Sequence, residues 1–247
     1  MKIMKKIAPF LIIFFLIIFA VLDSNQFNKK KKKDLIEQKI DQTTYWLIKN
    51  WYADEALKEW RPPQVVTVPP GTKVYGGCGD YLKGDKVSGS YYCGASYSIV
   101  LDPSQIKYFL EEFGPSSIAK IIAHEFSHAI QDVEQIRLKE PMHELQADCM
   151  AGILLSKGSE ELGITRQGII EMARAAHHSG GGKTHGSGDQ RVYALLSGMG
   201  IASGNCDASE MEALANNKIT DPIYLQIKNI RKTRSASSEL DLKQTPY

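Results

Sequence analysis

The feature that most constrains this chain is the motif His124-Glu125-x-x-His128, which lies inside a strongly apolar stretch. Residues four apart on an α-helix project from one face, so the two imidazoles could hold one metal ion. Apolar residues at positions 118, 121, 122, 126, 129, 130 and 133 predict a buried helix over 117–136. Burying two histidines and a glutamate without partners would be costly. The motif therefore predicts a zinc site in which Glu125 contacts a water beside the ion as a general base.

A catalytic zinc site uses three protein ligands and keeps one position open, so a third ligand must come from another segment. Glu144 and Asp148 share one face of a second predicted helix, over 141–156. We predict that Glu144 is the third ligand and that Asp148 orients the free ring nitrogen of a ligating histidine, most simply His124.

Two alternatives stay open at this point. His143 and Glu140 are rival candidates for the third ligand. A buried histidine and glutamate network without a metal is the alternative for the whole cluster. Small residues on the second helix, Ala147, Ala151 and Gly152, would allow it to approach the first helix closely.

Strand signals precede the helical part of the chain. Short β-branched or aromatic runs bounded by Pro, Gly and Ser predict a small antiparallel sheet, and the helical periods predict an α+β fold with the sheet first. The strands are expected at 64–68, 91–93 and 97–101, and further helices at 34–52, 106–113, 165–177 and 189–201. With 247 residues and one core, we expect a single catalytic domain over 34–247.

The N-terminal 33 residues differ from the rest of the chain in charge and in apolar content. Of the 30 basic and 28 acidic residues, eight lysines and one aspartate lie in residues 1–33, so the remainder carries a net charge of about −5. A nucleic-acid-binding domain would need a basic face, so we expect no nucleic-acid partner. The uncharged apolar run Ile7–Leu22 predicts a membrane anchor or signal segment, followed by a spacer with Lys29–Lys33. We expect a single-pass membrane protein with an extracytoplasmic domain; a cleaved, secreted form and, on charge alone, a cytoplasmic domain stay open.

The four cysteines are Cys78, Cys93, Cys149 and Cys206, and none forms a CxxC pair. An even number of cysteines behind an export segment predicts two disulfides formed in an oxidising compartment. The count alone does not choose among the three possible connectivities.

Beyond these patterns, the chain resembles the bacterial neutral zinc metallopeptidases that carry an N-terminal membrane segment, over most of residues 34–247. The most specific shared string is Glu144-Leu145-Gln146-Ala147-Asp148-Cys149, and other shared elements are Arg61-Pro62-Pro63, Val100-Leu101-Asp102, His124-Glu125 with His128 and Gln131, and His185-Gly186-Ser187 before Gln190-Arg191. The chain departs from the family pattern at Gly94 and Gly188.

The resemblance implies a zincin-like peptidase whose zinc ligands include a glutamate, acting on peptides or unfolded proteins. It also implies disulfides between Cys78 and Cys93 and between Cys149 and Cys206. A membrane-tethered zinc protein that binds envelope proteins without cutting them is the alternative function, although an intact Glu125 weighs against it.

Other polar residues have two interpretations each. His185 is a candidate donor to the oxyanion of the tetrahedral intermediate, or else it caps or braces the helix that begins near Asp189, with Arg191 making a structural pair. The strand Tyr97–Leu101 is either an edge strand that pairs with substrate or an interior strand. Asp102, which follows it, could cap the next helix or contact substrate.

Overall fold

The computed structural model describes residues 8–72 and 89–232, with side chains over 28–72 and 89–229. The chain divides into two compact units, residues 1–38 and 39–247, and helix α1 (Ala8–Ala53) contributes residues to both. The helix predicted over 34–52 is thus the last part of a longer one. Within the described ranges, no helix combines the length and apolar character needed to cross a membrane.

The second unit holds a three-stranded sheet made of β1 (Gln64–Thr67), β2 (Tyr91–Cys93) and β3 (Ser98–Leu101) in the order β1-β3-β2. β2 and β3 form an antiparallel hairpin, whereas β1 lies parallel to β3. The predicted fold class, a small sheet followed by helices, is confirmed, but the sheet is mixed rather than antiparallel. A tight turn dictates an antiparallel pair, whereas the long connection after β1 also permits a parallel one.

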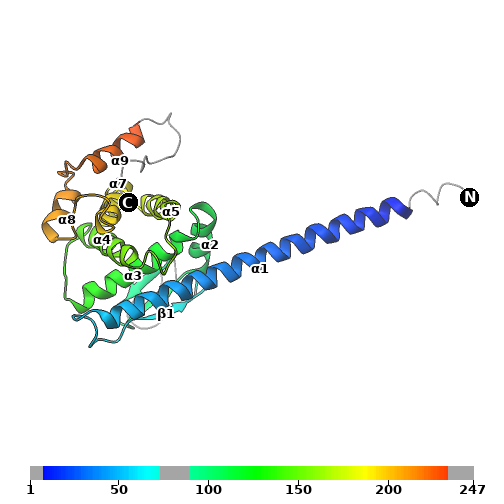
Figure 1. Ribbon diagram of the computed structural model, residues 1–247, viewed down its shortest axis with the longest axis horizontal. Helices are drawn as coiled ribbons and strands as arrows, with labels where there is room; N and C mark the ends of the chain where they lie inside the picture. The colour runs from blue at the N-terminus through cyan, green and yellow to red at the C-terminus, as the bar shows by residue number, and fades with distance from the viewer. Residues whose placement is uncertain (1–7, 73–88, 233–247) are drawn as a thin grey trace, which may run out of the picture. The chain divides into compact units, whose positions relative to one another are not determined.

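Helices follow the sheet. Their bounds are α2 (Pro103–Glu112), α3 (Ser116–Val133), α4 (Met142–Lys157), α5 (Arg166–His178), α6 (Gly182–His185), α7 (Gly188–Gly198), α8 (Ala208–Ala215) and α9 (Pro222–Lys232). Five of these match the helices expected from periodicity, and α6, α8 and α9 were not predicted. Helix α3 packs against α4 and α5, and α7 packs against the same two helices (Figure 1).

Helices α4 and α7 meet backbone to backbone at two glycines. A Cβ at Gly152 would overlap the carbonyl oxygen of Leu195, and a Cβ at Gly198 would overlap that of Cys149. Gly152 therefore allows a close approach to α7, not to the histidine helix as its position in the sequence had suggested. This contact fixes α4, the helix that carries Glu144, against a second long helix.

We expect Gly198→Ala to destabilise the protein by about 1–3 kcal/mol, because the added methyl must displace the backbone of α4. Denaturant unfolding of the full chain measures the change. Gly181→Ala is the matched control, since a Cβ there meets no atom within 4 Å. Equal stability of the two variants would contradict the packing described for α4 and α7.

Candidate metal centre

Helix α3 carries the histidine motif through the interior of the unit. Most of its residues are buried, including Ile118, Ile122 and Phe126 with at most 1% exposure. His124 and Glu125 are buried as well, at 6% and 7% exposure. The apolar residues of the helix therefore place these two polar side chains in the core, where each needs a partner.

Glu144 lies in the first turn of α4 and meets both imidazoles. Its Oε2 is 3.3 Å from His124 Nε2, and its Oε1 is 3.2 Å from His128 Nε2. One carboxylate thus faces two ring nitrogens from a neighbouring helix. The three ligand atoms offered by these residues lie within 4.8 Å of one another.

The other nitrogen of each imidazole is also fixed. His124 Nδ1 lies 3.0 Å from Asp148 Oδ1, one helical turn beyond Glu144. His128 Nδ1 lies 2.8 Å from Gln131 Oε1, and the amide nitrogen of Gln131 donates to Gln146 Oε1 at 3.0 Å. The amide is therefore oriented so that its oxygen faces His128.

Both nitrogens of His128 face an oxygen acceptor, whereas His124 Nε2 faces Glu144 Oε2 and also the Nη2 donor of Arg191, at 3.4 Å. A neutral imidazole carries only one N–H, so His128 cannot donate on both sides. His128 is therefore an imidazolium ion, or a cation lies on the Nε2 side shared with Glu144. A zinc ion satisfies this requirement, because neutral imidazole and carboxylate are its ordinary ligands.

The pKa values of His128 and Glu144 are shifted by the same contacts. Burial lowers the pKa of His128, but hydrogen bonding and charge from Glu144 outweigh it and raise the pKa to about 9. Burial alone would raise the pKa of Glu144, yet the two imidazoles hold it well below the usual range. The cluster thus favours positive charge on His128 and negative charge on Glu144.

The spacing also suits zinc. With bonds of about 2.1 Å, neighbouring ligand atoms around a tetrahedral ion are about 3.4 Å apart, close to the observed 3.2 and 3.3 Å. Among the described residues, the group that could hold a metal consists of His124, His128 and Glu144. The rivals, His143 and Glu140, are outside it. The residues therefore fit zinc and leave a fourth position for a non-protein ligand.

Glu125 is held beside this group by the sheet. The backbone N–H of Tyr92 in β2 donates to Glu125 Oε2 at 2.8 Å. Burial raises the pKa of Glu125, while the neighbouring imidazoles act in the opposite direction. A base with a raised pKa beside a metal-binding group is suited to take and return a proton near neutral pH.

His185 lies at the rim of the site, at the end of α6. Its side chain is 51% exposed, its Nε2 is 3.9 Å from Glu144 Oε2, and its Nδ1 is 2.8 Å from Thr184 Oγ1. His185 does not cap the following helix, because Ser187 and Gln190 form the capping box of α7. The proposed catalytic role of His185 stays a prediction.

Two basic residues that the sequence analysis did not place in the site surround Asp148. Arg191 donates to Asp148 Oδ2 through Nε at 2.5 Å and to Oδ1 through Nη2 at 3.2 Å. Lys120 Nζ lies 2.8 Å from Asp148 Oδ1. Lys120 lies one helical turn before His124, on the same face of an apolar helix. This position in the sequence could have identified Lys120 as a residue of the site.

Two predictions about the sheet are resolved as well. β3, which contains most of Tyr97–Leu101, is the central strand, so the idea that it is an edge strand open to substrate is wrong. Asp102 caps α2, since its Oδ1 accepts from Ser104 N at 2.8 Å. Asp102 has this role because it is the single residue between the end of β3 and the start of α2.

One of the two predicted disulfides lies within the described residues. Cys149 on α4 is bonded to Cys206, which closes a loop of 57 residues next to the metal-binding group. The carbonyl of Cys206 also accepts a hydrogen bond from Gln146 Nε2 at 2.9 Å. The other predicted pair includes Cys78, which lies outside the described residues, so that pairing stays a prediction.

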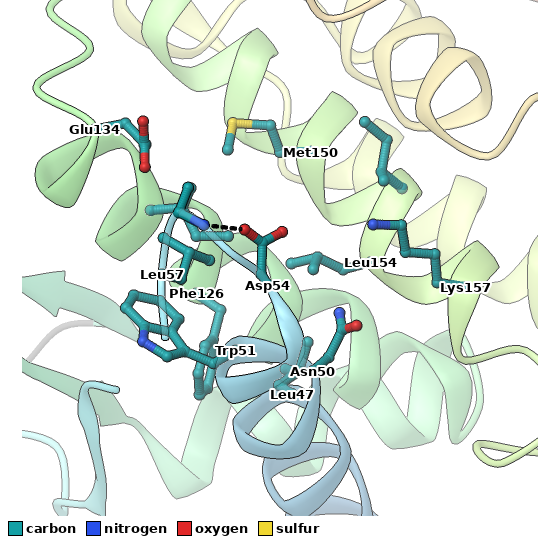
Figure 2. Close-up of a pocket in the computed structure, with 13 residues that line it drawn as sticks. Leu47, Asn50, Trp51, Asp54, Leu57, Phe126, Glu134, Met150, Leu154 and Lys157 are labelled. Atoms are coloured by element: carbon teal, nitrogen blue, oxygen red, sulfur yellow. Dashed lines mark hydrogen bonds between the residues drawn. The ribbon is translucent and has the colours of Figure 1, made fainter. Parts of the chain in front are cut away.

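A cavity of about 260 Å³ lies beside α3 (Figure 2). Its walls come from the end of α1, from α3 and from α4, and include Trp51, Phe126 and Leu154. Phe126 is about 200° around the helix from His124, so the cavity and the histidines use different faces. It contains none of the predicted metal ligands and is not the candidate site.

Comparison with protein families gives a direct match. Residues 21–210 match the model of the family described as "Putative neutral zinc metallopeptidase". A search of curated proteins and a search of solved structures each found no significant match. The matched range spans most of the chain and includes all three residues of the metal-binding group. The chain therefore belongs to the neutral zinc metallopeptidase family that this model describes.

Proposed function

We propose that this protein is a zinc-dependent peptidase that hydrolyses peptide bonds in peptides or unfolded proteins. The observation that carries the proposal is the convergence of His124, His128 and Glu144 with the buried Glu125 beside them. A purely structural zinc site would be closed by a fourth protein ligand and would not need a base at this position.

His124, His128 and Glu144 would hold the ion. Zinc bound there would act as a Lewis acid that acidifies a water molecule and polarises a carbonyl group. Glu125 accepts the proton of the attacking water and returns it to the leaving amine. The hydrogen bond from Tyr92 to Glu125 Oε2 keeps the carboxylate in place and leaves Oε1 for the water.

The surrounding residues orient the ligands. Asp148 and Gln131 fix the rings of His124 and His128 from the side away from the ion, which favours metal binding through Nε2. Arg191 holds Asp148 through two hydrogen bonds. His185, at the exposed rim, is our candidate for the donor to the oxyanion that forms when the carbonyl is attacked.

The decisive test is to purify the full chain, measure bound zinc and follow cleavage of an unfolded protein by the wild type and by Glu125→Gln. Zinc at one ion per chain with cleavage by the wild type alone supports the proposal. Zinc with no cleavage of any protein or peptide by the wild type would instead support the alternative of a binding protein.

We also propose that the catalytic domain lies outside the cytoplasm, attached to the membrane by the N-terminal segment. The bond between Cys149 and Cys206 supports this location, because structural disulfides persist in oxidising compartments. We expect both cysteines to be oxidised in protein taken from acid-quenched cells, as measured by alkylation and mass mapping. Free thiols at both positions would contradict an extracytoplasmic location.

A further inference from the structure

A cavity of about 380 Å³ opens directly beside the metal-binding group. Its lining is mostly polar or charged and includes Ser90, Gln105, Lys120, Glu125, His185 and Arg191. The volume is within the range of sites that bind small molecules or substrate side chains. Since Glu125 is part of the wall, the cavity is placed to receive a group close to the bond that is cleaved.

Lys120 is the unusual residue of this cavity. It is only 2% exposed, and within the described ranges its ammonium nitrogen has one hydrogen-bond partner, Asp148 Oδ1 at 2.8 Å. An ammonium group has three N–H donors. A buried cation with unused donors is costly unless another acceptor reaches it, and the cavity is the route by which an acceptor could arrive.

The charges point to an anionic acceptor. Asp148 is shared by two cations, Lys120 and Arg191, so one positive charge remains. Bound zinc would add two positive charges, and the carboxylates of Glu144 and Glu125 would balance them. The single positive charge left over from Lys120, Arg191 and Asp148 would therefore remain. Arg191 is already engaged by Asp148 and by the carbonyl of Ser179, at 3.0 Å, whereas Lys120, which lines the cavity, has Asp148 as its one partner among the described residues.

We propose that this cavity binds an acidic side chain of the substrate, aspartate or glutamate, next to the cleaved peptide bond, and that Lys120 is the residue that determines this specificity. The substrate carboxylate accepts a hydrogen bond from Lys120 Nζ, and the positive charge of Arg191 adds electrostatic attraction. This inference rests on the proposed peptidase function and names its substrate class.

The first test compares cleavage of matched peptides by the full, zinc-loaded chain. Peptides that carry Asp or Glu at each position near the scissile bond are paired with Asn or Gln counterparts. A charge-assisted hydrogen bond supports a preference of about 10-fold or more in kcat/KM for the acidic peptide at one position. A ratio near one at every position would overturn the proposal.

The second test uses Lys120→Met, which keeps the volume of the side chain and removes its charge. We expect the ratio of kcat/KM for the acidic peptide to that for the amide peptide to fall to about one, whatever the rate at which the amide peptide is cleaved. If Lys120 only supported Asp148, both peptides would lose rate equally and the ratio would stay. Lys107→Met is the matched control, because Lys107 is an exposed lysine on the neighbouring α2.

A binding measurement separates this inference from the peptidase proposal. The full-length Glu125→Gln variant, loaded with zinc, is titrated with an Asp peptide and its Asn counterpart. Tighter binding of the Asp peptide, by about 10-fold, supports the acidic site even if the wild type cleaves nothing. Equal binding overturns it, and this result does not depend on whether Lys120→Met folds.

Discussion

Glu125→Gln is expected to lower kcat for peptide-bond cleavage by about 10²–10⁴-fold while zinc stays bound. Glutamine has nearly the same shape as glutamate. Its side-chain oxygen can accept the hydrogen bond that the backbone N–H of Tyr92 donates to Glu125 Oε2 in the wild type. It cannot accept a proton from water. Because Glu125 does not belong to the group that would hold the ion, the metal content should stay at the wild-type value.

Cleavage rates and zinc content of the same preparations provide the measurement. Glu140→Gln is the matched control, since it makes the same chemical change at a carboxylate outside the metal-binding group. It should retain wild-type activity. Wild-type activity in Glu125→Gln would remove the mechanism assigned to this residue, even if zinc were bound.

Glu144→Gln is expected to weaken zinc binding by more than the 10–100-fold that loss of a supporting partner usually costs. The reason is that this carboxylate contributes the only negative charge among the three predicted ligands and faces both imidazoles, at 3.2 and 3.3 Å. Competition with a chromophoric chelator measures the affinity of the full chain. Activity should fall in proportion to the zinc that is lost.

His143→Ala is the comparison that decides between the rival ligands. His143 lies on the same helix, but it is outside the group whose ligand atoms converge. We expect its zinc affinity to match that of the wild type. If His143→Ala lost the ion and Glu144→Gln kept it, the assignment of the third ligand would have to be reversed.

The sequence predicted the parts of this structure that depend on local patterns. Helices α3 and α4 follow from apolar periodicity, and the four-residue spacing of His124 and His128 is itself a helical property. Helix α9 was missed although it has a start signal: Asp221 Oδ1 accepts from Ile223 N at 2.7 Å. Among its residues whose side chains are described, the buried ones are Tyr224 and Ile227.

Relations between distant segments could not be predicted in the same way. The parallel orientation of β1 depends on a long connection, and no local pattern specifies it. The partners of Lys120 are likewise set by tertiary structure, because Asp148 and Arg191 come from α4 and α7. A lysine in an apolar helix is usually expected to extend its charge to solvent, and only the packing of three helices shows that this one does not.

The contact between α4 and α7 has a consequence for how the metal would be taken up. With Gly152 and Gly198 interlocked and Cys149 tied to Cys206, the backbone that carries Glu144 is ordered by the protein itself. Small zinc domains fold only around their ion and spend much of the affinity on ordering the chain. We therefore expect the packing of α4 against α7 to order Glu144 largely without the ion, so that less of the binding free energy is spent on ordering the chain.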